Sequence, residues 1–196
     1  MKLYHCPQTR SSRAVWMLEE CGADYEMEIV KIMEGEKPAH FLKENPMGKV
    51  PALVDEGVVI TESAAICAYL ADKFPEKKLA PAIGDPKRGA YYRWLFFMAG
   101  VMEPAFIQKA MGWKAERQGM VGWGDFDRML NTLKTEIPEE GWLVTDHFTA
   151  ADLLVGGTLV FLSQSGLFEI WPAAEAYGAR CTDRPAMKRA QEKDAG

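Results

Sequence analysis

A cluster of hydroxyl side chains lies where a short strand is expected to lead into a helix. Residues 2–6 form a strand candidate, and residues 11–21 place apolar side chains on one helical face. Thr9, Ser11 and Ser12 occupy the polar junction between them. Backbone N–H groups and the positive end of a helix dipole converge at such a junction, so it can stabilise an anion such as a thiolate. Alternatively, one hydroxyl simply caps the helix, as Ser and Thr often do.

The dipeptide Val50-Pro51 begins a strand expected near the centre of a sheet. Proline gives a sheet no backbone donor, so its presence there needs a reason, and a cis bond in a tight turn is one. A cis bond would turn the backbone N–H and C=O of Val50 outward, where a peptide ligand could pair with them as a strand does. An ordinary loop proline is the alternative.

The pair Glu62-Ser63 stands at the start of another expected helix. A carboxylate at this point can bind an ammonium group, while the Ser63 hydroxyl and backbone N–H can bind a carboxylate. Together they would hold an amino-acid zwitterion. A plain N-terminal cap is the alternative interpretation.

The three segments belong to an alternation of strand and helix patterns. Its order is strand, helix, strand, helix, strand, strand, helix, which is the α/β topology of a thioredoxin-like domain. Strands are expected at residues 2–6, 25–30, 51–55 and 58–60, and helices at residues 11–21, 38–43 and 63–74.

The rest of the chain reads as helical. A stretch rich in proline and charge marks a linker at residues 76–87. Apolar helical patterns follow at residues 88–111, 121–135, 150–164, 171–180 and 184–193. We therefore expect a thioredoxin-like domain at residues 1–75 and an all-helical bundle domain at residues 88–196.

Composition narrows the class of protein. Hydrophobic residues make up 48% and charged residues 26%, as in a water-soluble globular protein. The net charge of −5, with both signs interleaved, argues against a nucleic-acid partner. The chain lacks a signal-like start or an apolar run long enough for a membrane, which predicts a cytoplasmic protein. Its cysteines form no ligand pattern, so no metal is expected; they are Cys6, Cys21, Cys67 and Cys181.

A later motif can be interpreted on its own. Thr149 and Asp152 have the spacing of an N-capping box variant, and Phe148 with Leu153 could form the accompanying hydrophobic staple. We expect this motif to start a buried helix and to take no part in a reaction.

In this order and spacing, the segments resemble the glutathione transferase family over nearly the whole chain. The resemblance is carried by residues 45–53 (NPMGKVPAL), the Glu62-Ser63 pair and residues 148–152 (FTAAD). It implies that glutathione binds across the thioredoxin-like domain, with its cysteine paired to the backbone of Val50 before Pro51. Glu62 and Ser63 would hold the γ-glutamyl end, and Lys49 would face the glycine carboxylate.

The resemblance also implies a reaction. A hydrogen bond to sulfur lowers the pKa of a thiol, which is about 8.5 without one, and the thiolate then attacks a hydrophobic electrophile. Thr9 falls where many family members carry the activating serine, with Ser11 and then Ser12 as the next candidates. The long aromatic run of the helical domain should line the electrophile pocket or form helical core; its members are residues 91–98, Glu103, Phe106, Met111 and Trp113.

Two other functions stay open. Some family members use a Cys-Pro pair as a thiol that forms a mixed disulfide with glutathione, and a reactive Cys6 would make this chain a thiol transferase, or a disulfide or peroxide reductase. In those members an arginine follows after about five positions, where this chain has Ser11, so the register favours Cys6 as a strand-end residue. A non-catalytic binding module is the other possibility. The family further implies a homodimer and a role in detoxification.

Overall fold

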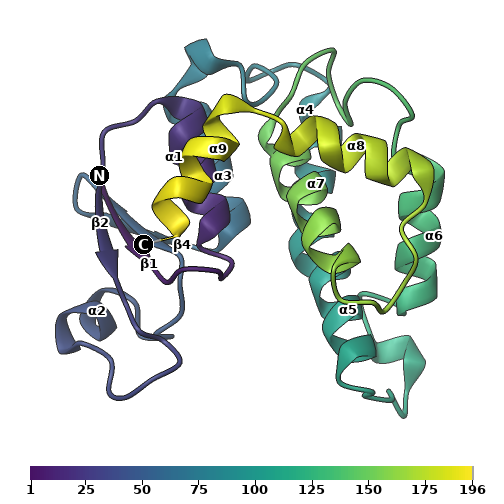
Figure 1. Cartoon of the computed structure of the whole chain (residues 1–196), viewed down its shortest axis with the longest axis horizontal. Helices are drawn as coiled ribbons and strands as arrows, with labels where there is room; N and C mark the ends of the chain where they lie inside the picture. The colour runs from purple at the N-terminus through teal and green to yellow at the C-terminus, as the bar shows by residue number, and fades with distance from the viewer. Residues whose placement is uncertain (196) are drawn as a thin grey trace. The chain divides into compact units, whose positions relative to one another are not determined.

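The structure is a computed structural model that describes residues 1–195, and its elements follow the expected order (Figure 1). The strands are β1 (Lys2–His5), β2 (Glu26–Ile29), β3 (Ala52–Asp55) and β4 (Val58–Thr61). The helices of the first part are α1 (Ser12–Cys21), α2 (Ala39–Glu44), α3 (Ser63–Lys73) and the short η1 (Pro75–Lys77). Those that follow are α4 (Arg88–Phe97), η2 (Met98–Met102), α5 (Glu103–Ala110), η3 (Gln118–Met120), α6 (Phe126–Glu136), α7 (Ala150–Ser163), α8 (Pro172–Thr182) and α9 (Pro185–Asp194).

Contacts divide the chain into two compact units. The first unit contains residues 1–78 together with the described residues from Asp183 onward, and the second contains Leu79–Thr182. The sequence predicted that the helical domain continues to the end of the chain, whereas in the structure α9 belongs to the first unit, where it lies along α1 (Figure 1).

The first unit has a four-stranded mixed sheet of order β2-β1-β3-β4, and the predicted thioredoxin-like fold is confirmed. β1 pairs in parallel with β2 and antiparallel with β3, and β3 pairs antiparallel with β4. The register sets Tyr4 opposite Ala52 and Ala52 opposite Thr61. β3 therefore lies inside the sheet, as the sequence predicts.

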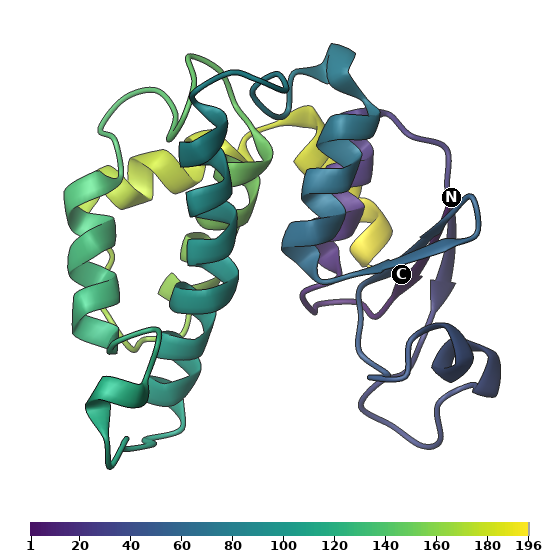
Figure 2. The same cartoon turned by 180° about the vertical axis from the view of Figure 1, so that it is seen from behind.

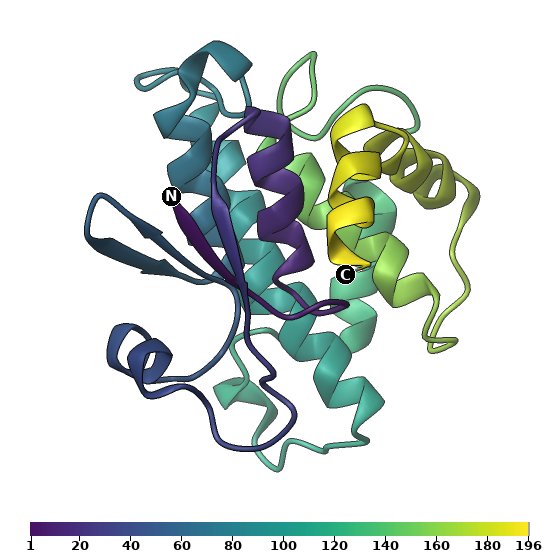
Figure 3. The ribbon, with the colours of Figure 1, turned by 60° about the vertical axis from the view of Figure 1, so that its left-hand side comes forward.

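Neighbouring residues of a strand point to opposite sides of the sheet. In this unit, both faces of the sheet are covered. Tyr4, Ala52 and Phe41 of α2 meet in one buried cluster on one face. On the other face α1 and α3 lie side by side (Figures 2 and 3).

Charged pairs attach α9 to α1. The buried carboxylate of Glu19 accepts hydrogen bonds from Arg189 Nε at 2.9 Å and Lys193 Nζ at 2.5 Å. Arg184 pairs with both carboxylate oxygens of Glu20, at 2.6 and 2.8 Å. Burial raises the pKa of Glu19, but Lys193, Arg189 and the Tyr25 hydroxyl outweigh it and hold that pKa below its ordinary value of 4.5.

In the second unit, the run expected as one helix over residues 88–111 is interrupted by the π-helical turn η2. Pro104, just after this turn, has no N–H for the normal helical ladder, and the Glu103 N–H bonds to the carbonyl of Met98, five residues earlier. The helical backbone nevertheless continues without a gap from Arg88 to Ala110, so α4, η2 and α5 form one helix with a π-helical turn inside it.

The predicted capping motif starts α7. Asp152 is fully buried and accepts hydrogen bonds from the Thr149 N–H at 2.9 Å, the Leu143 N–H at 2.9 Å and the Tyr177 hydroxyl at 3.0 Å. Burial raises the pKa of Asp152 although these hydrogen bonds oppose the rise. The motif serves folding, as expected. Among residues 1–195, none of the helices combines the length and apolarity that crossing a bilayer requires.

Close packing of α7 against α8 generates a first prediction. A Cβ atom at Gly156 would lie 2.4 Å from Cys181 Sγ, so Gly156→Ala should destabilise the protein by about 1–3 kcal/mol in urea unfolding. Gly89→Ala is the matched control, because a Cβ at this exposed helical position meets open space and should stabilise by up to about 1 kcal/mol. A Gly156→Ala protein of unchanged stability would contradict this packing.

The α1–α9 charge cluster predicts a pH dependence. The folded-state pKa of Glu19 is lowered, so its contribution to stability is complete above the unfolded-state pKa and is lost as pH falls through the folded-state value. Glu19→Gln should cost about 1–2 kcal/mol at pH 7, and the difference from wild type should disappear at acid pH. Unfolding curves from pH 7 to pH 3 measure this; a constant difference would contradict the assignment.

Candidate functional site

The sheet register brings the three motif segments together at one end of the sheet. β1 ends at His5, β3 begins at Ala52 and β4 ends at Thr61, and the register places these three ends together. The segments next to these strand ends are the loop carrying Thr9, the Val50-Pro51 turn and the Glu62-Ser63 pair. One end of the sheet is therefore the candidate site.

Within the first loop, the hydroxyls of Thr9 and Ser11 hold the backbone of Cys6. Thr9 Oγ1 lies 2.8 Å from the Cys6 carbonyl, and Ser11 Oγ lies 2.9 Å from the same oxygen and accepts from the Cys6 N–H at 3.1 Å. Ser11 occupies the N-cap position of α1, but its side chain makes no capping hydrogen bond. The simple capping role weighed for Ser11 is therefore absent.

The three hydroxyl groups differ in what they can still bind. Ser11 is fully buried. Ser12 donates to Asp194 Oδ1 at 2.7 Å. Thr9 is partly exposed, lies 2.8 Å from Ser11 Oγ and accepts from the Ser11 N–H at 3.2 Å. Thr9 thus combines some solvent access with a fixed position, while Cys6 packs against the apolar cluster around Tyr4.

The second segment is a tight turn that enters β3. The Val50-Pro51 peptide bond is cis, which is one of the two alternatives that the sequence left open. The buried Asn45 side chain donates to the Lys49 carbonyl at 2.7 Å, and the Lys49 side chain is exposed. Gly48 has φ +59, and a Cβ there would lie 2.9 Å from Lys37 Cδ, so both backbone conformation and space favour glycine. The sequence did not predict this role for Asn45.

In the third segment, Glu62 has a strained backbone and an uncommitted carboxylate. Its φ of 68° and ψ of 122° are rare for a residue with a side chain, and such strain is often found at functional sites. The side chain is exposed, does not cap α3, and within residues 1–195 makes no hydrogen bond or ion pair. Ser63, the first residue of α3, is buried. The capping alternative weighed for Glu62 is therefore not what its side chain does.

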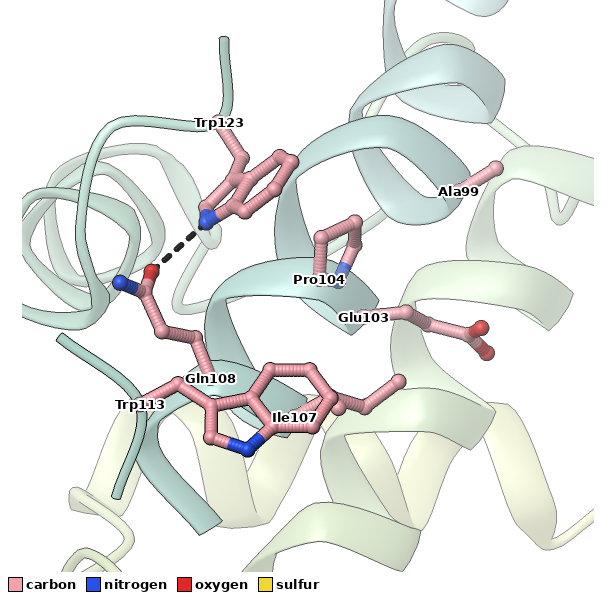
Figure 4. Close-up of a pocket in the computed structure, with 7 residues that line it drawn as sticks. All are labelled: Ala99, Glu103, Pro104, Ile107, Gln108, Trp113 and Trp123. Carbon is pink, nitrogen blue, oxygen red and sulfur yellow. Dashed lines mark hydrogen bonds between the residues drawn. The ribbon is translucent and has the colours of Figure 1, made fainter. Parts of the chain in front are cut away.

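The second unit contains an apolar cavity of about 280 Å³ on α5. Figure 4 shows the Trp113 and Trp123 rings over the face of α5 that carries Pro104 and Ile107. Trp123 Nε1 donates to Gln108 Oε1 at 2.7 Å, which fixes one ring. The cavity is lined by Ala99, Glu103, Pro104, Ile107, Gln108, Trp113 and Trp123.

Only part of the predicted aromatic lining belongs to this cavity. Glu103 and Trp113 line it, whereas Tyr91, Trp94 and Met98 are buried in the core of the helical unit. The core alternative is therefore correct for these three residues. Trp123 was missed, because residues 111–125 form mostly irregular backbone with no periodic pattern that assigns a face. Gln108 lies on α5 and was missed because the predicted lining was chosen for aromatic and methionine side chains.

A thioredoxin-like unit with these motifs at one sheet end, joined to a helical unit, defines a glutathione-transferase-type fold, and comparisons identify the family. Residues 1–72 match the model of the glutathione S-transferase N-terminal domain. Glutathione S-transferase D7 of Drosophila melanogaster is 30% identical over 81% of this chain and 73% of its own. The chain belongs to the glutathione S-transferase family.

Solved structures agree. A glutathione transferase of Methylococcus capsulatus is 31% identical, with a TM-score of 0.82 over 99% of this chain and 98% of its own. A sphingomonad glutathione S-transferase solved in complex with glutathione is 27% identical, with a TM-score of 0.78 over 100% and 99% of the two chains.

The strain at Glu62 can be tested apart from any ligand. Glycine adopts a positive φ without a steric penalty, so Glu62→Gly should raise the free energy of unfolding by about 1 kcal/mol. Glu62→Ala is the matched control: it removes the same carboxylate but keeps the strain, and its stability should stay within about 0.5 kcal/mol of wild type. Equal stabilities of the Gly and Ala variants would show that the conformation is relaxed in solution.

Proposed function

We propose that this chain is a glutathione transferase that binds glutathione at the sheet end formed by the three motif segments. The observation that carries the proposal is Glu62, because an exposed carboxylate without a partner in residues 1–195 is held there by strained backbone beside Ser63. In the proposed complex Glu62 binds the γ-glutamyl ammonium group and Ser63 binds the adjoining carboxylate. Glutathione is a co-substrate, and no metal takes part.

The remaining contacts follow from the same placement. The backbone of Val50 pairs with the cysteine of glutathione, next to Pro51, and the exposed Lys49 ammonium binds the glycine carboxylate. Their support is that residues 45–53 match the family pattern and that β3 enters the sheet beside the loop carrying Thr9. Opposite charges thus meet the two ends of a zwitterionic peptide.

Thr9 is the proposed catalytic residue. Its hydroxyl donates a hydrogen bond to the glutathione sulfur, which favours the thiolate and so raises the concentration of the nucleophile. Ser11, the second candidate, is supported less, because its buried hydroxyl already lies among protein groups. The thiolate then attacks an electrophilic carbon. The apolar cavity on α5 suits an aromatic or aliphatic acceptor.

The experiment measures glutathione binding and the pKa of the bound thiol. A hydrogen bond to a charged group contributes about 1.5–3 kcal/mol, so Thr9→Ala should raise the thiol pKa by roughly 1–2 units and slow conjugation of a chloronitrobenzene about 10–100-fold. Glutathione affinity should change little. Glu62→Gln should instead weaken binding about tenfold or more.

Matched controls separate these roles from general damage. Thr135→Ala removes an exposed helical hydroxyl, and Glu56→Gln removes an exposed carboxylate on another residue of positive φ. Both should leave binding and rate unchanged. Cys6→Ser tests the reductase alternative: loss of hydroperoxide or disulfide reduction in this variant, with Thr9→Ala active, would favour thiol chemistry at Cys6. Failure of wild type to bind glutathione would refute the proposed function.

A further inference from the structure

A fully buried histidine lies beneath the loop that carries Thr9. His5 ends β1, and its Nδ1 is 2.7 Å from Ser11 Oγ. On the other side of the ring, Nε2 is 3.1 Å from Oδ1 of Asp194. Because Ser11 Oγ is also 2.8 Å from Thr9 Oγ1, four side chains form a continuous row from Asp194 to Thr9. None of the motifs in the sequence accounts for His5 or Asp194.

The Asp194 carboxylate contacts three groups from a distant part of the sequence. It accepts from the Ser12 hydroxyl at 2.7 Å and from the Gln8 N–H at 3.3 Å to each oxygen, and it faces His5. Gln8 has a φ of 57°, a left-handed conformation that needs support in a residue with a side chain. The Asp194 carboxylate therefore stabilises the conformation of the loop on both sides of Thr9.

The position of Asp194 suits this loop better than it suits its own helix. Asp194 is the last residue of α9, where the negative end of the helix dipole disfavours a carboxylate. Ser12, which it binds, is the first residue of α1, where the positive end of another dipole favours one. The carboxylate thus bridges the end of α9 and the start of α1.

The row of contacts also determines which hydroxyl can give a proton. Burial lowers the pKa of His5 although Asp194 opposes the change, so the ring is neutral at neutral pH. Its one proton is favoured on Nε2, because Nε2 faces the Asp194 carboxylate at 3.1 Å, although this contact does not have the geometry of a hydrogen bond. Nδ1 is then an acceptor, and at 2.7 Å it competes with the Cys6 carbonyl, at 2.9 Å, for the single proton of Ser11. We place that proton on the side of Nδ1, because the buried Nδ1 would otherwise have no donor.

Thr9 is consequently the hydroxyl with a proton to donate. With its proton on His5, Ser11 cannot donate to Thr9, so the proton of the pair that can still turn is the one on Thr9. Without a ligand, that proton lies toward Ser11 Oγ or the Cys6 carbonyl, each at 2.8 Å, and a bound thiolate would draw it to the sulfur. The Ser11 N–H, which donates to Thr9 Oγ1 at 3.2 Å, holds the Thr9 oxygen in place. If the His5 proton moved to Nδ1, Ser11 would regain a free proton and compete with Thr9 as the donor.

We propose that Asp194 and His5 are positioning residues that act through Ser11 to orient the Thr9 hydroxyl toward the sulfur of glutathione. The end of α9 is then part of the thiol-activating machinery, although it contacts no substrate. This inference rests on the proposed role of Thr9.

The test replaces Asp194 with its neutral isostere. Asp194→Asn should raise the pKa of enzyme-bound glutathione, followed by thiolate absorbance, by about one unit, equivalent to a tenfold change in the ionisation equilibrium. At a pH below the thiol pKa, kcat should fall about tenfold, because the thiolate fraction falls by that factor. Glutathione affinity and the melting temperature should stay close to those of the wild type. Asp183→Asn is the matched control, because Asp183 is an exposed carboxylate just before α9 that pairs with Lys188. It should change none of these quantities.

A double-substitution cycle shows whether the effect passes through Thr9. In a Thr9→Ala background, Asp194→Asn should shift the thiol pKa by less than about 0.3 unit, because the hydroxyl it orients is gone. Asp194→Glu, which restores the charge, should recover part of the wild-type pKa. A full shift in the Thr9→Ala background, or a lower melting temperature with an unchanged thiol pKa, would overturn the proposal.

The two proposals fail in different ways. An Asp194→Asn protein with wild-type thiol pKa, alongside a shifted Thr9→Ala protein, would overturn the role of Asp194 and His5 alone. A Thr9→Ala protein with wild-type thiol pKa would remove Thr9 as the activating residue and this inference with it.

Discussion

The pairing of β3 with both β1 and β4 determines where every candidate group of the first unit lies. Tyr4, Ala52 and Thr61 lie in one row across the sheet, so the three chain segments next to them lie at the same end of the sheet. A shift of the register by one residue would exchange the side chains of the two covered faces, so the burial of Leu3 and Leu53 on one face and Tyr4 on the other holds the pairing in place. The hydrophobic core thereby determines where the candidate site lies, and Val50 belongs to both.

Buried polar groups in this protein organise backbone at the places where elements meet. Ser11 holds the Cys6 backbone at the end of β1, Asn45 holds the Lys49 carbonyl before β3, and Asp152 collects the backbone that leads into α7. Each has specific partners because an unpaired buried polar group costs about 1–3 kcal/mol. These residues hold the backbone at the points where the elements of the fold meet.

The local features were the most predictable from the sequence. The hydrophobic period, the proline and glycine positions and the capping residues located the strands and helices of the first unit within a few residues, because each depends on near neighbours in the chain. The π-helical turn η2 was missed, since Pro104 was not weighed against the strong apolar pattern around it. The motif segments, too, were recognisable by residue type and order.

By itself, the sequence determined the thioredoxin-like order of elements, the family and the residue types offered to a glutathione-like ligand. Only the tertiary structure decided which of these groups are buried and which lie close together. It buried Ser11 and left Thr9 partly exposed, although both are hydroxyls two residues apart. It also joined Asp194 to His5 and Gln8 across more than 180 residues, and moved α9 from the helical unit to the first one. Such contacts depend on how whole elements pack, and no short window of the chain carries that information.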